Sequence, residues 1–248
     1  MIFLFTDFST RDPYVGQMHA AILRRADVPV IDLLHHVPNH DMRAGAYLLD
    51  ALQHGCSPGD VLVCVVDPGV GGARAPVMVK ADGKWYVGPD NGLFEMVRRR
   101  SRSVEVSRID WRPQTLSASF HGRDLFSPVG AMLAAGELPS SSPWTLRDVD
   151  GWPEDLNEII YIDHFGNAIT GYRAGSVFDG ALMRIKDRRL ARGRTFSSVS
   201  PGEALWYRNS MGLLEIAVRE GSAADLLGLA IGDSFDITDY EALVTEPS

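Results

Sequence analysis

The first half of the chain alternates between short apolar runs and amphipathic stretches. The mostly apolar runs cover residues 2–5, 28–33 and 61–66. All three are predicted to be strands, and the uninterrupted runs 2–5 and 61–66 are typical of buried strands. Residues 14–25 carry apolar positions at the 3.6-residue period of a helix. This alternation predicts an α/β fold.

Two capping signals predict helices. Asp41 is suited to an N-cap, and Gly55 is placed to end a helix whose apolar positions fall at helical spacing, at Ala44, Tyr47, Leu48, Ala51 and Leu52. Ser127 followed by Pro128 has the pattern of an N-cap with proline in the first turn. The second pattern predicts that residues 121–124 form the loop just before a helix.

A turn pair, Asp82-Gly83, divides the apolar stretch 77–87. Both residue types adopt positive φ angles readily, so this stretch is predicted to be a β-hairpin. A hairpin within an α/β alternation implies a mixed sheet.

The composition changes between residues 138 and 153, where proline, serine and glycine accumulate without periodicity. Beyond this segment the apolar runs are short and separated by glycine and aspartate, at residues 158–162, 182–185, 204–207 and 213–218. We therefore expect an N-terminal α/β domain over residues 1–150 and a small β-domain over residues 151–248.

Composition and charge exclude several classes of protein. Hydrophobic residues make up 45% of the 248 and charged residues 23%, which is the balance of a globular protein. A net charge of -8 leaves no broad cationic surface for a nucleic acid. The first apolar run stops at Asp7, too short for a membrane span, and Cys64 lies inside an apolar run as a small core residue would. We expect a cytoplasmic protein with no nucleic-acid or membrane partner.

A carboxylate and a glycine-rich loop follow the apolar run 61–66. Asp67 opens the loop and Arg74 closes it, at the carboxyl end of a strand where α/β proteins usually bind ligands. A phosphate loop is excluded, because residues 76–79 continue as a strand and supply no helix N-terminus. Taken alone, Asp67 fits a structural turn and a catalytic role equally well.

Two further polar residues stand in comparable places. His121 is followed by Gly122, which leaves space beside the imidazole. Asp7 follows a buried strand as Asp67 does, and a carboxylate there is suited to accept hydrogen bonds from ribose hydroxyls. The alternative is that Asp7 and Asp12 only cap a turn or helix.

Seven histidines raise the question of a metal. His35, His36 and His40 are close in sequence, but His36 and His40 share a face only in a helix, and Pro38 argues against one. We expect no metal.

Six short blocks of sequence together resemble one family, the S-adenosyl-L-methionine (SAM) hydroxide adenosyltransferases, which are related to the SAM-dependent fluorinase and chlorinase. The blocks lie in the family's order along nearly the whole chain, at residues 6–8, 67–71, 88–92, 120–124, 163–167 and 209–212.

The resemblance implies an N-terminal α/β domain, a C-terminal β-barrel and a homotrimer with active sites between subunits. It implies hydrolysis of SAM to adenosine and L-methionine without a cofactor. By the same resemblance Asp67, Arg74 and His121 orient the attacking water. Asp7 holds the ribose hydroxyls, Phe120 and Phe165 form aromatic walls, and the remaining substrate contacts come from Gly122, Asp163, Asn167, Ser210 and Met211. Ser9 and His40 depart from the pattern of the family and its halogenase relatives.

The chemistry suits these residue types on separate grounds. A sulfonium leaves as a neutral thioether, so neither an acid nor a metal is needed at the leaving group. Water must lose a proton, for which an imidazole such as His121 is suited, while Asp67 fixes its tautomer and Arg74 orients the carboxylate or stabilises hydroxide. Which group finally takes the proton stays open at this point.

Three alternatives remain. A halogenase would use chloride or fluoride at the same carbon, although the charge of Asp67 would repel a halide. A non-catalytic sensor of SAM or adenosine would return its ligand unchanged. A metal-dependent hydrolase would lose its activity on chelation.

Overall fold

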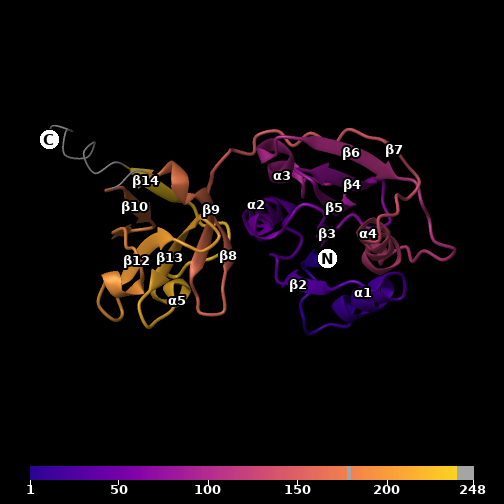
Figure 1. The fold of residues 1–248 in the computed structure, drawn as a ribbon. Coiled ribbons are helices and arrows are strands. Elements are labelled where there is room, and N and C mark those ends of the chain that lie inside the picture. The colour runs from indigo at the N-terminus through magenta and orange to yellow at the C-terminus, as the bar shows by residue number, and fades with distance from the viewer. Residues whose placement is uncertain (178–179, 239–248) are drawn as a thin grey trace. The chain divides into compact units, whose positions relative to one another are not determined.

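The computed structural model describes residues 1–177 and 180–238. The chain divides into two compact units, Met1–Gly151 and Trp152–Ser248, which are described separately (Figure 1). The sequence placed this boundary between residues 150 and 151. Residues 239–248 of the expected second domain lie outside the described residues.

The first unit is built on a seven-stranded mixed sheet in the order β2-β1-β3-β5-β4-β6-β7. The first four of these strands run parallel, and the remaining neighbours pair antiparallel. The strands are β1 (Ile2–Thr6), β2 (Val30–Leu34), β3 (Val61–Val65), β4 (Pro76–Ala81), β5 (Lys84–Pro89), β6 (Val104–Ile109) and β7 (Ser141–Pro143).

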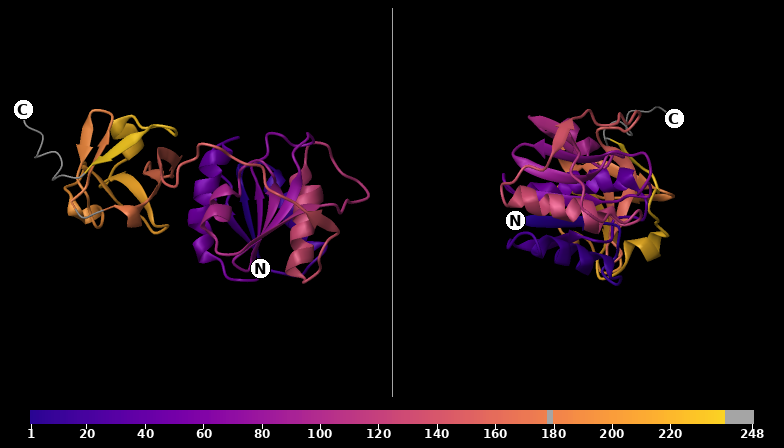
Figure 2. Two further views of the ribbon diagram at one scale, coloured as in Figure 1. Left: turned by 90° about the horizontal axis from the view of Figure 1, so that it is seen from above. Right: turned by 90° about the vertical axis from the view of Figure 1, so that its right-hand side faces the viewer.

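Helices cover both faces of this sheet (Figure 2). They are α1 (Tyr14–Leu23), α2 (Met42–Leu52), α3 (Glu95–Arg100) and α4 (Ser127–Ala134). Residues of α1 and α4 share one core with Ile2 and Leu4 of β1 and with alternate residues of β3. Helix α2 lies on the other face. Alternate β3 side chains point to opposite faces. Since helices cover both faces, the whole of β3 is buried.

Three local predictions are confirmed. Asp41 is the N-cap of α2 and accepts a hydrogen bond from the Ala44 amide at 2.9 Å. β4 and β5 form the predicted hairpin, with positive φ at Asp82 (46°) and Gly83 (81°). Cys64 is fully buried.

One helix start was predicted wrongly. The π-helical turn Gly122–Phe126 runs directly into α4, so Ser127 lies inside a continuous helical segment and is no N-cap. Pro128 directly follows this turn, whose last bond, from the Ser127 amide to the Gly122 carbonyl, has the i→i+5 spacing of a π-helix. His121 therefore begins a helix instead of preceding one.

The second unit contains two antiparallel sheets, in the orders β11-β10-β14 and β12-β13-β9-β8. Its elements are β8 (Leu156–Ile162), β9 (Ala168–Arg173), β10 (Leu182–Ile185), β11 (Arg188–Leu190), β12 (Ala204–Arg208), β13 (Leu213–Val218), α5 (Ala223–Leu227) and β14 (Phe235–Thr238). They enclose a core around Trp206. The fold is thus mixed α/β with a separate antiparallel β unit.

Isolated bridges connect the two sheets of this unit. Glu158 of β8 pairs with Ser234 just before β14, and Arg192 just after β11 pairs with Trp206 of β12. The closed β-barrel expected from the resemblance stays a prediction.

No helix in the part of the chain that the structure describes is long and apolar enough to cross a membrane.

Candidate functional site

The parallel pairing of β1 with β3 brings two carboxylates to one edge of the first sheet. Thr6 is in register with Val65, so Asp7 and Asp67 both follow the carboxyl ends of adjacent strands. Parallel strands present these ends together, which is where ligands bind in open α/β sheets. Burial raises the pKa of Asp7, and the charge of Asp67 adds to this effect.

Asp67 forms a nearly buried ion pair with Arg74 across the glycine-rich loop. The Arg74 Nε lies 3.0 and 3.1 Å from the two carboxylate oxygens, and Nη2 also donates to Asp67 Oδ2. The exposed fractions of the two side chains are 4% and 9%. A two-pronged contact of this kind fixes the plane of the guanidinium as well as its position.

Arg74 also contacts His121. Its Nη2 donates to the His121 Nδ1 at 2.8 Å, and the guanidinium lies over the Phe126 ring, with Cζ 5.3 Å from the centroid. Asp67, Arg74 and His121 thus form a linear chain with the arginine in the middle. We had expected Asp67 to fix the imidazole tautomer, but the contact with Nδ1 comes from Arg74.

This contact defines which ring nitrogen carries the proton in the neutral imidazole. A guanidinium only donates hydrogen bonds, so Nδ1 is the acceptor and the ring proton is on Nε2. Burial and the charge of Arg74 hold the pKa of His121 below its ordinary value. The ring therefore presents a neutral Nε2–H donor.

The glycine-rich loop packs against the segment that leads to His121. Gly71 has φ of 75°, and a Cβ at this position would overlap the carbonyl oxygen of Ala118. Only glycine combines this conformation with so close an approach. This contact holds the loop between Asp67 and Arg74 against the His121 segment.

Aromatic rings gather beside His121. The centroids of Phe8, Tyr14 and Phe120 lie 5.4 to 5.9 Å apart. A Cβ on Gly122 would stand 3.3 Å from ring carbons of both Phe8 and Phe120. The missing side chain of Gly122 therefore makes room for these rings, whereas we had expected the space beside the imidazole. Phe8 and Tyr14 were not among the predicted site residues.

The histidines near Asp7 do not assemble with other ligands. Within residues 1–177 and 180–238, no three His, Cys, Asp or Glu side chains are arranged to hold a metal ion. His35 is buried and contacts Thr6, whereas the His40 side chain is 75% exposed. Its backbone amide donates to Asp7 Oδ2 at 3.1 Å.

In the second unit, Asp163 and Asn167 build the turn between β8 and β9. Asp163 Oδ1 accepts the amides of Phe165 and Asn167, both at 2.9 Å, and Oδ2 accepts the Asn167 side-chain amide at 2.9 Å. Both carboxylate oxygens thus serve the turn itself. The turn presents Phe165, which is 74% exposed.

Phe165 and Asn167 line an apolar cavity of about 470 Å³ with four residues that sequence reasoning missed, Phe196, Val218, Glu220 and Gly221. Val218 ends β13, which pairs with β9 just after the 163–167 turn. That pairing joins residues about 50 positions apart, and no local spacing in the sequence reveals it.

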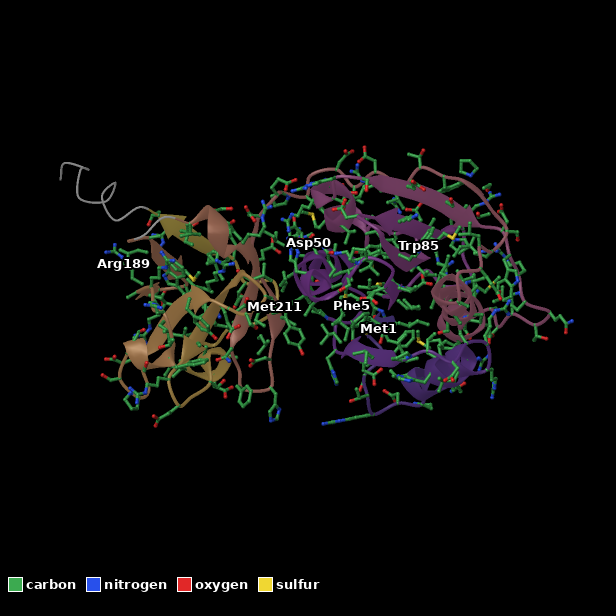
Figure 3. The ribbon with its side chains drawn as sticks, viewed as in Figure 1. Met1, Phe5, Asp50, Trp85, Arg189 and Met211 are labelled. Atoms are coloured by element: carbon green, nitrogen blue, oxygen red, sulfur yellow. The ribbon has the colours of Figure 1, made fainter. Side chains whose placement is uncertain are left out.

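Ser210 and Met211 lie in the turn between β12 and β13, where Figure 3 labels Met211. The buried Asn209 shapes this turn, because its Oδ1 accepts the amides of Met211 and Leu213, both at 3.0 Å. Its Nδ2 donates to the buried Glu215 at 3.0 Å, and the Tyr207 hydroxyl donates to the same carboxylate. The predicted site residues therefore form two groups, one on each unit.

Two family models match most of the chain. Residues 2–142 match the SAM hydroxide adenosyltransferase N-terminal domain, and residues 157–236 match the C-terminal domain. A relative from Thermus thermophilus, named (R)-S-adenosyl-L-methionine hydrolase, is 40% identical, with 93% of this chain and 96% of the relative covered. A relative of the same name from Salinispora tropica is 36% identical over 94% of this chain and 95% of its own length.

Solved structures agree with this match. A conserved protein of uncharacterized function from Thermotoga maritima superimposes with a TM-score of 0.81 at 30% identity, covering 96% of this chain and 99% of that chain. A conserved hypothetical protein from Thermus thermophilus gives 0.76 at 34% identity, with the same coverage. The order of the sequence blocks, the fold and the matched domains agree, and the chain belongs to the SAM hydroxide adenosyltransferase family.

Proposed function

We infer that this protein is an enzyme that hydrolyses SAM to adenosine and L-methionine. The observation that carries the inference is the linear contact of Asp67, Arg74 and His121 at the carboxyl edge of the sheet, in a chain whose relatives are named for hydrolysis of (R)-S-adenosyl-L-methionine.

The reaction balances without a cofactor. The oxygen of water bonds to the ribose C5′, the C5′–S bond breaks, and its electron pair goes to sulfur, which leaves as the neutral thioether of methionine. One proton is released in each turnover. The positive charge on sulfur is lost as the C–O bond forms, so exclusion of bulk water around the reacting atoms favours the step.

We propose that His121 orients the water and that Arg74 fixes the tautomer and the orientation of the imidazole. With Nδ1 held by Arg74, the His121 Nε2–H is free to donate to the oxygen of water or developing hydroxide. This assignment differs from the general-base role considered from sequence, because Nε2 accepts a proton only if Nδ1 carries one and loses the bond from Arg74.

The substrate-binding roles are proposals of the same kind. Asp7 is suited to accept the ribose hydroxyls beside the aromatic group of Phe8, Tyr14 and Phe120. The apolar cavity between Phe165 and Phe196 is suited to the adenine ring, which stacks on aromatic faces. Gly122, Asp163, Asn167, Ser210 and Met211 then shape the surroundings of the substrate, mostly through backbone and turn geometry.

We further propose that the enzyme needs no metal, works in the cytoplasm without a nucleic-acid or membrane partner, and forms a homotrimer with active sites between subunits. The free thiols of Cys56 and Cys64 fit a reducing compartment. The C-terminal β-barrel is also proposed. The bridges from β8 to the start of β14, and from the end of β11 to β12, support a single closed ring of strands.

One assay tests the reaction. Incubation of purified protein with SAM in oxygen-18 water should give equal amounts of adenosine and methionine, with the heavy oxygen in the 5′ hydroxyl. The relatives' names lead us to expect turnover of the (R)-sulfonium epimer over the (S) epimer. Unchanged SAM would indicate a sensor, and 5′-chloro-5′-deoxyadenosine as the main product in chloride buffer would indicate a halogenase.

Chelation tests the absence of a cofactor. Activity should survive exhaustive treatment with a chelator, because the proposed step uses no metal. Loss of activity that one added metal ion restores would favour the metal-dependent hydrolase instead.

A further inference from the structure

A buried hydroxyl and a buried imidazole contact each other next to Asp7 in the first unit. Thr6, the last residue of β1, has no exposed surface, and His35 follows the last residue of β2. The Thr6 Oγ1 lies 2.8 Å from the His35 Nδ1. Neither group has a part in the water-directing chain of Asp67, Arg74 and His121.

The hydrogen positions of this pair follow from its neighbours. The His35 Nε2 lies 3.0 Å from Asp32 Oδ1, and an ionised carboxylate only accepts, so Nε2 carries the proton of the neutral ring. Nδ1 is then an acceptor and the Thr6 hydroxyl donates to it. The same hydroxyl oxygen accepts the amide of Phe8 at 3.2 Å. The hydroxyl and Nδ1 are therefore hydrogen-bonded, whereas the alignment of the His35 Nε2 with Asp32 is too poor for a hydrogen bond and leaves only a charge attraction.

The order hydroxyl, imidazole, carboxylate is that of a nucleophilic triad. Thr6 cannot act as a nucleophile, however, because its side chain is enclosed and no substrate atom can approach it. What the arrangement fixes is the backbone on either side of Thr6.

Asp7 lies within that fixed backbone. The Val37 amide donates to the Thr6 carbonyl at 3.3 Å, and the Ser9 amide donates to the His35 carbonyl at 2.7 Å. The His40 backbone amide then donates a hydrogen bond to Asp7 Oδ2. The segment after β2 thus wraps around the end of β1 and is joined to it by side-chain and backbone bonds.

We propose that His35 is a positioning residue that acts through Thr6 to orient the Asp7 carboxylate toward the ribose hydroxyls. The proposal rests on the proposed function, since it assumes that Asp7 binds the ribose of SAM. It predicts that loss of the Thr6–His35 bond weakens recognition of the ribose without removing any group that touches the substrate.

The test compares two substitutions of Thr6. Thr6→Val keeps the shape of the side chain and removes the hydroxyl, whereas Thr6→Ser keeps the hydroxyl. In Thr6→Val, and likewise in His35→Leu, we expect KM for SAM to rise about tenfold with a smaller loss in kcat, which corresponds to about 1.4 kcal/mol of binding free energy. Thr6→Ser should stay near the parent protein.

His19→Asn is the matched control. His19 donates to the same Asp32 oxygen at 2.6 Å, and its replacement leaves the Thr6–His35 pair in place. This variant should keep the parent KM. An increase in KM as large as that of His35→Leu would assign the effect to Asp32 and its surroundings, and would contradict the proposal.

A binding ratio separates positioning from general destabilisation. Calorimetry with adenosine and 2′-deoxyadenosine measures the preference for the ribose hydroxyl, and this preference should fall severalfold in Thr6→Val and His35→Leu. Partial unfolding lowers the apparent affinity for both ligands equally and leaves their ratio unchanged. A parent-like ratio in folded Thr6→Val would overturn the proposal, as would a Thr6→Ser variant as impaired as Thr6→Val.

These measurements also separate the proposal from the proposed function. If the parent protein binds adenosine and leaves SAM intact, the hydrolase assignment fails while the ratio still decides the role of His35. If the parent hydrolyses SAM and the ratio does not change, only the positioning role fails.

Discussion

The His121 imidazole lies at the end of the chain that runs from Asp67 through Arg74, and burial together with these two charges sets its protonation. Burial and Arg74 lower the pKa of this ring, while Asp67 raises it to a smaller extent. Because the pKa is lowered, the neutral form persists as the pH falls below about 6.5, the ordinary value for histidine. We therefore expect the acid limb of the pH–rate profile to lie below that pH.

An NMR titration of the His121 ring measures this pKa without relying on activity. Arg74→Gln removes the cationic neighbour that lowers the pKa and should raise it toward or above the ordinary value. An unchanged His121 pKa in that variant would show that the guanidinium does not control the ring.

Substitutions of His121 distinguish a donor from a base. His121→Ala and Asp67→Ala should each cost about a hundredfold or more in rate while substrate binding stays largely intact. His121→Gln places an amide N–H near the position of Nε2 and cannot act as a base. If His121 is a donor, we expect His121→Gln to exceed His121→Ala severalfold in kcat. Equal kcat values in the two variants would favour the general-base role of His121.

At the scale of residues, the sequence was sufficient to name the three proposed catalytic residues, but not to show which of them contact each other. The resemblance located Asp67, Arg74 and His121 from blocks that are far apart in the chain. The arginine lies between the other two in a loop whose Gly71 packs on the Ala118 carbonyl, with the Arg74 guanidinium over the Phe126 ring. Those contacts join segments more than 40 positions apart, and no sequence period encodes them.

The glycine-rich loop offers a test at the scale of elements. Gly71→Ala combines the cost of a left-handed conformation, about 1–2 kcal/mol, with overlap on the Ala118 carbonyl oxygen. Relief of the overlap moves the loop away from the His121 segment and lengthens the Arg74–His121 contact. We expect kcat/KM to fall at least about tenfold, since misplacement of a catalytic group by about 1 Å can cost a hundredfold.

Gly59→Ala provides the control for backbone conformation. Gly59 also has a positive φ, 92°, and a Cβ there meets nothing within 4 Å in the described structure. It precedes β3, at the end of that strand opposite to Asp67. This variant should lose the stability that the left-handed conformation costs, measured in a thermal melt, and keep its kcat/KM. Equal losses of activity in both variants would remove the loop contact from the explanation.

A second element-scale prediction concerns the β12–β13 turn. Glu215→Ala leaves the buried Asn209 amide and the Tyr207 hydroxyl without their acceptor, and should lower the free energy of unfolding by about 2–4 kcal/mol. Tyr207→Phe removes only one partner and should cost less. Urea denaturation of the three proteins measures the difference, and equal stability of Glu215→Ala and the parent would contradict it.

Elements with strong local signals were predictable, and those defined by their neighbours were not. Asp41 and the Asp82-Gly83 pair act within a few residues, so their patterns were sufficient. The helix that begins at His121 starts with a π-turn, whose spacing differs from the 3.6-residue period used to recognise helices. The short α3 and α5, and strands β6 and β7, depend on packing more than on periodicity, and none of them was predicted.

At the scale of the whole molecule, the division into two units follows from composition. The unpatterned segment ends near the observed division at Gly151, although its first part belongs to the first unit, where β7 pairs with β6 and Trp144 and Arg147 donate to Asp90. The residues proposed for catalysis lie on the first unit, and the apolar cavity proposed for adenine lies on the second. Sequence blocks predicted both groups, whereas the oligomer that the resemblance implies needs a test in solution.

Complementation provides that test. His121→Ala inactivates the first unit's group, and replacement of Phe165 and Phe196 by alanine removes the aromatic walls of the second unit's cavity. Each variant alone should be nearly inactive. If every active site combines the first unit of one subunit with the second unit of the next, subunits mixed at equal amounts, unfolded and refolded together should recover about one quarter of the parent activity, because each site then has independent chances of receiving both intact groups. A site formed within one chain gives no recovery, since every chain carries one defect.

Light scattering of the active parent measures the oligomer directly. We expect a mass of three subunits, and an active monomer would exclude the shared site.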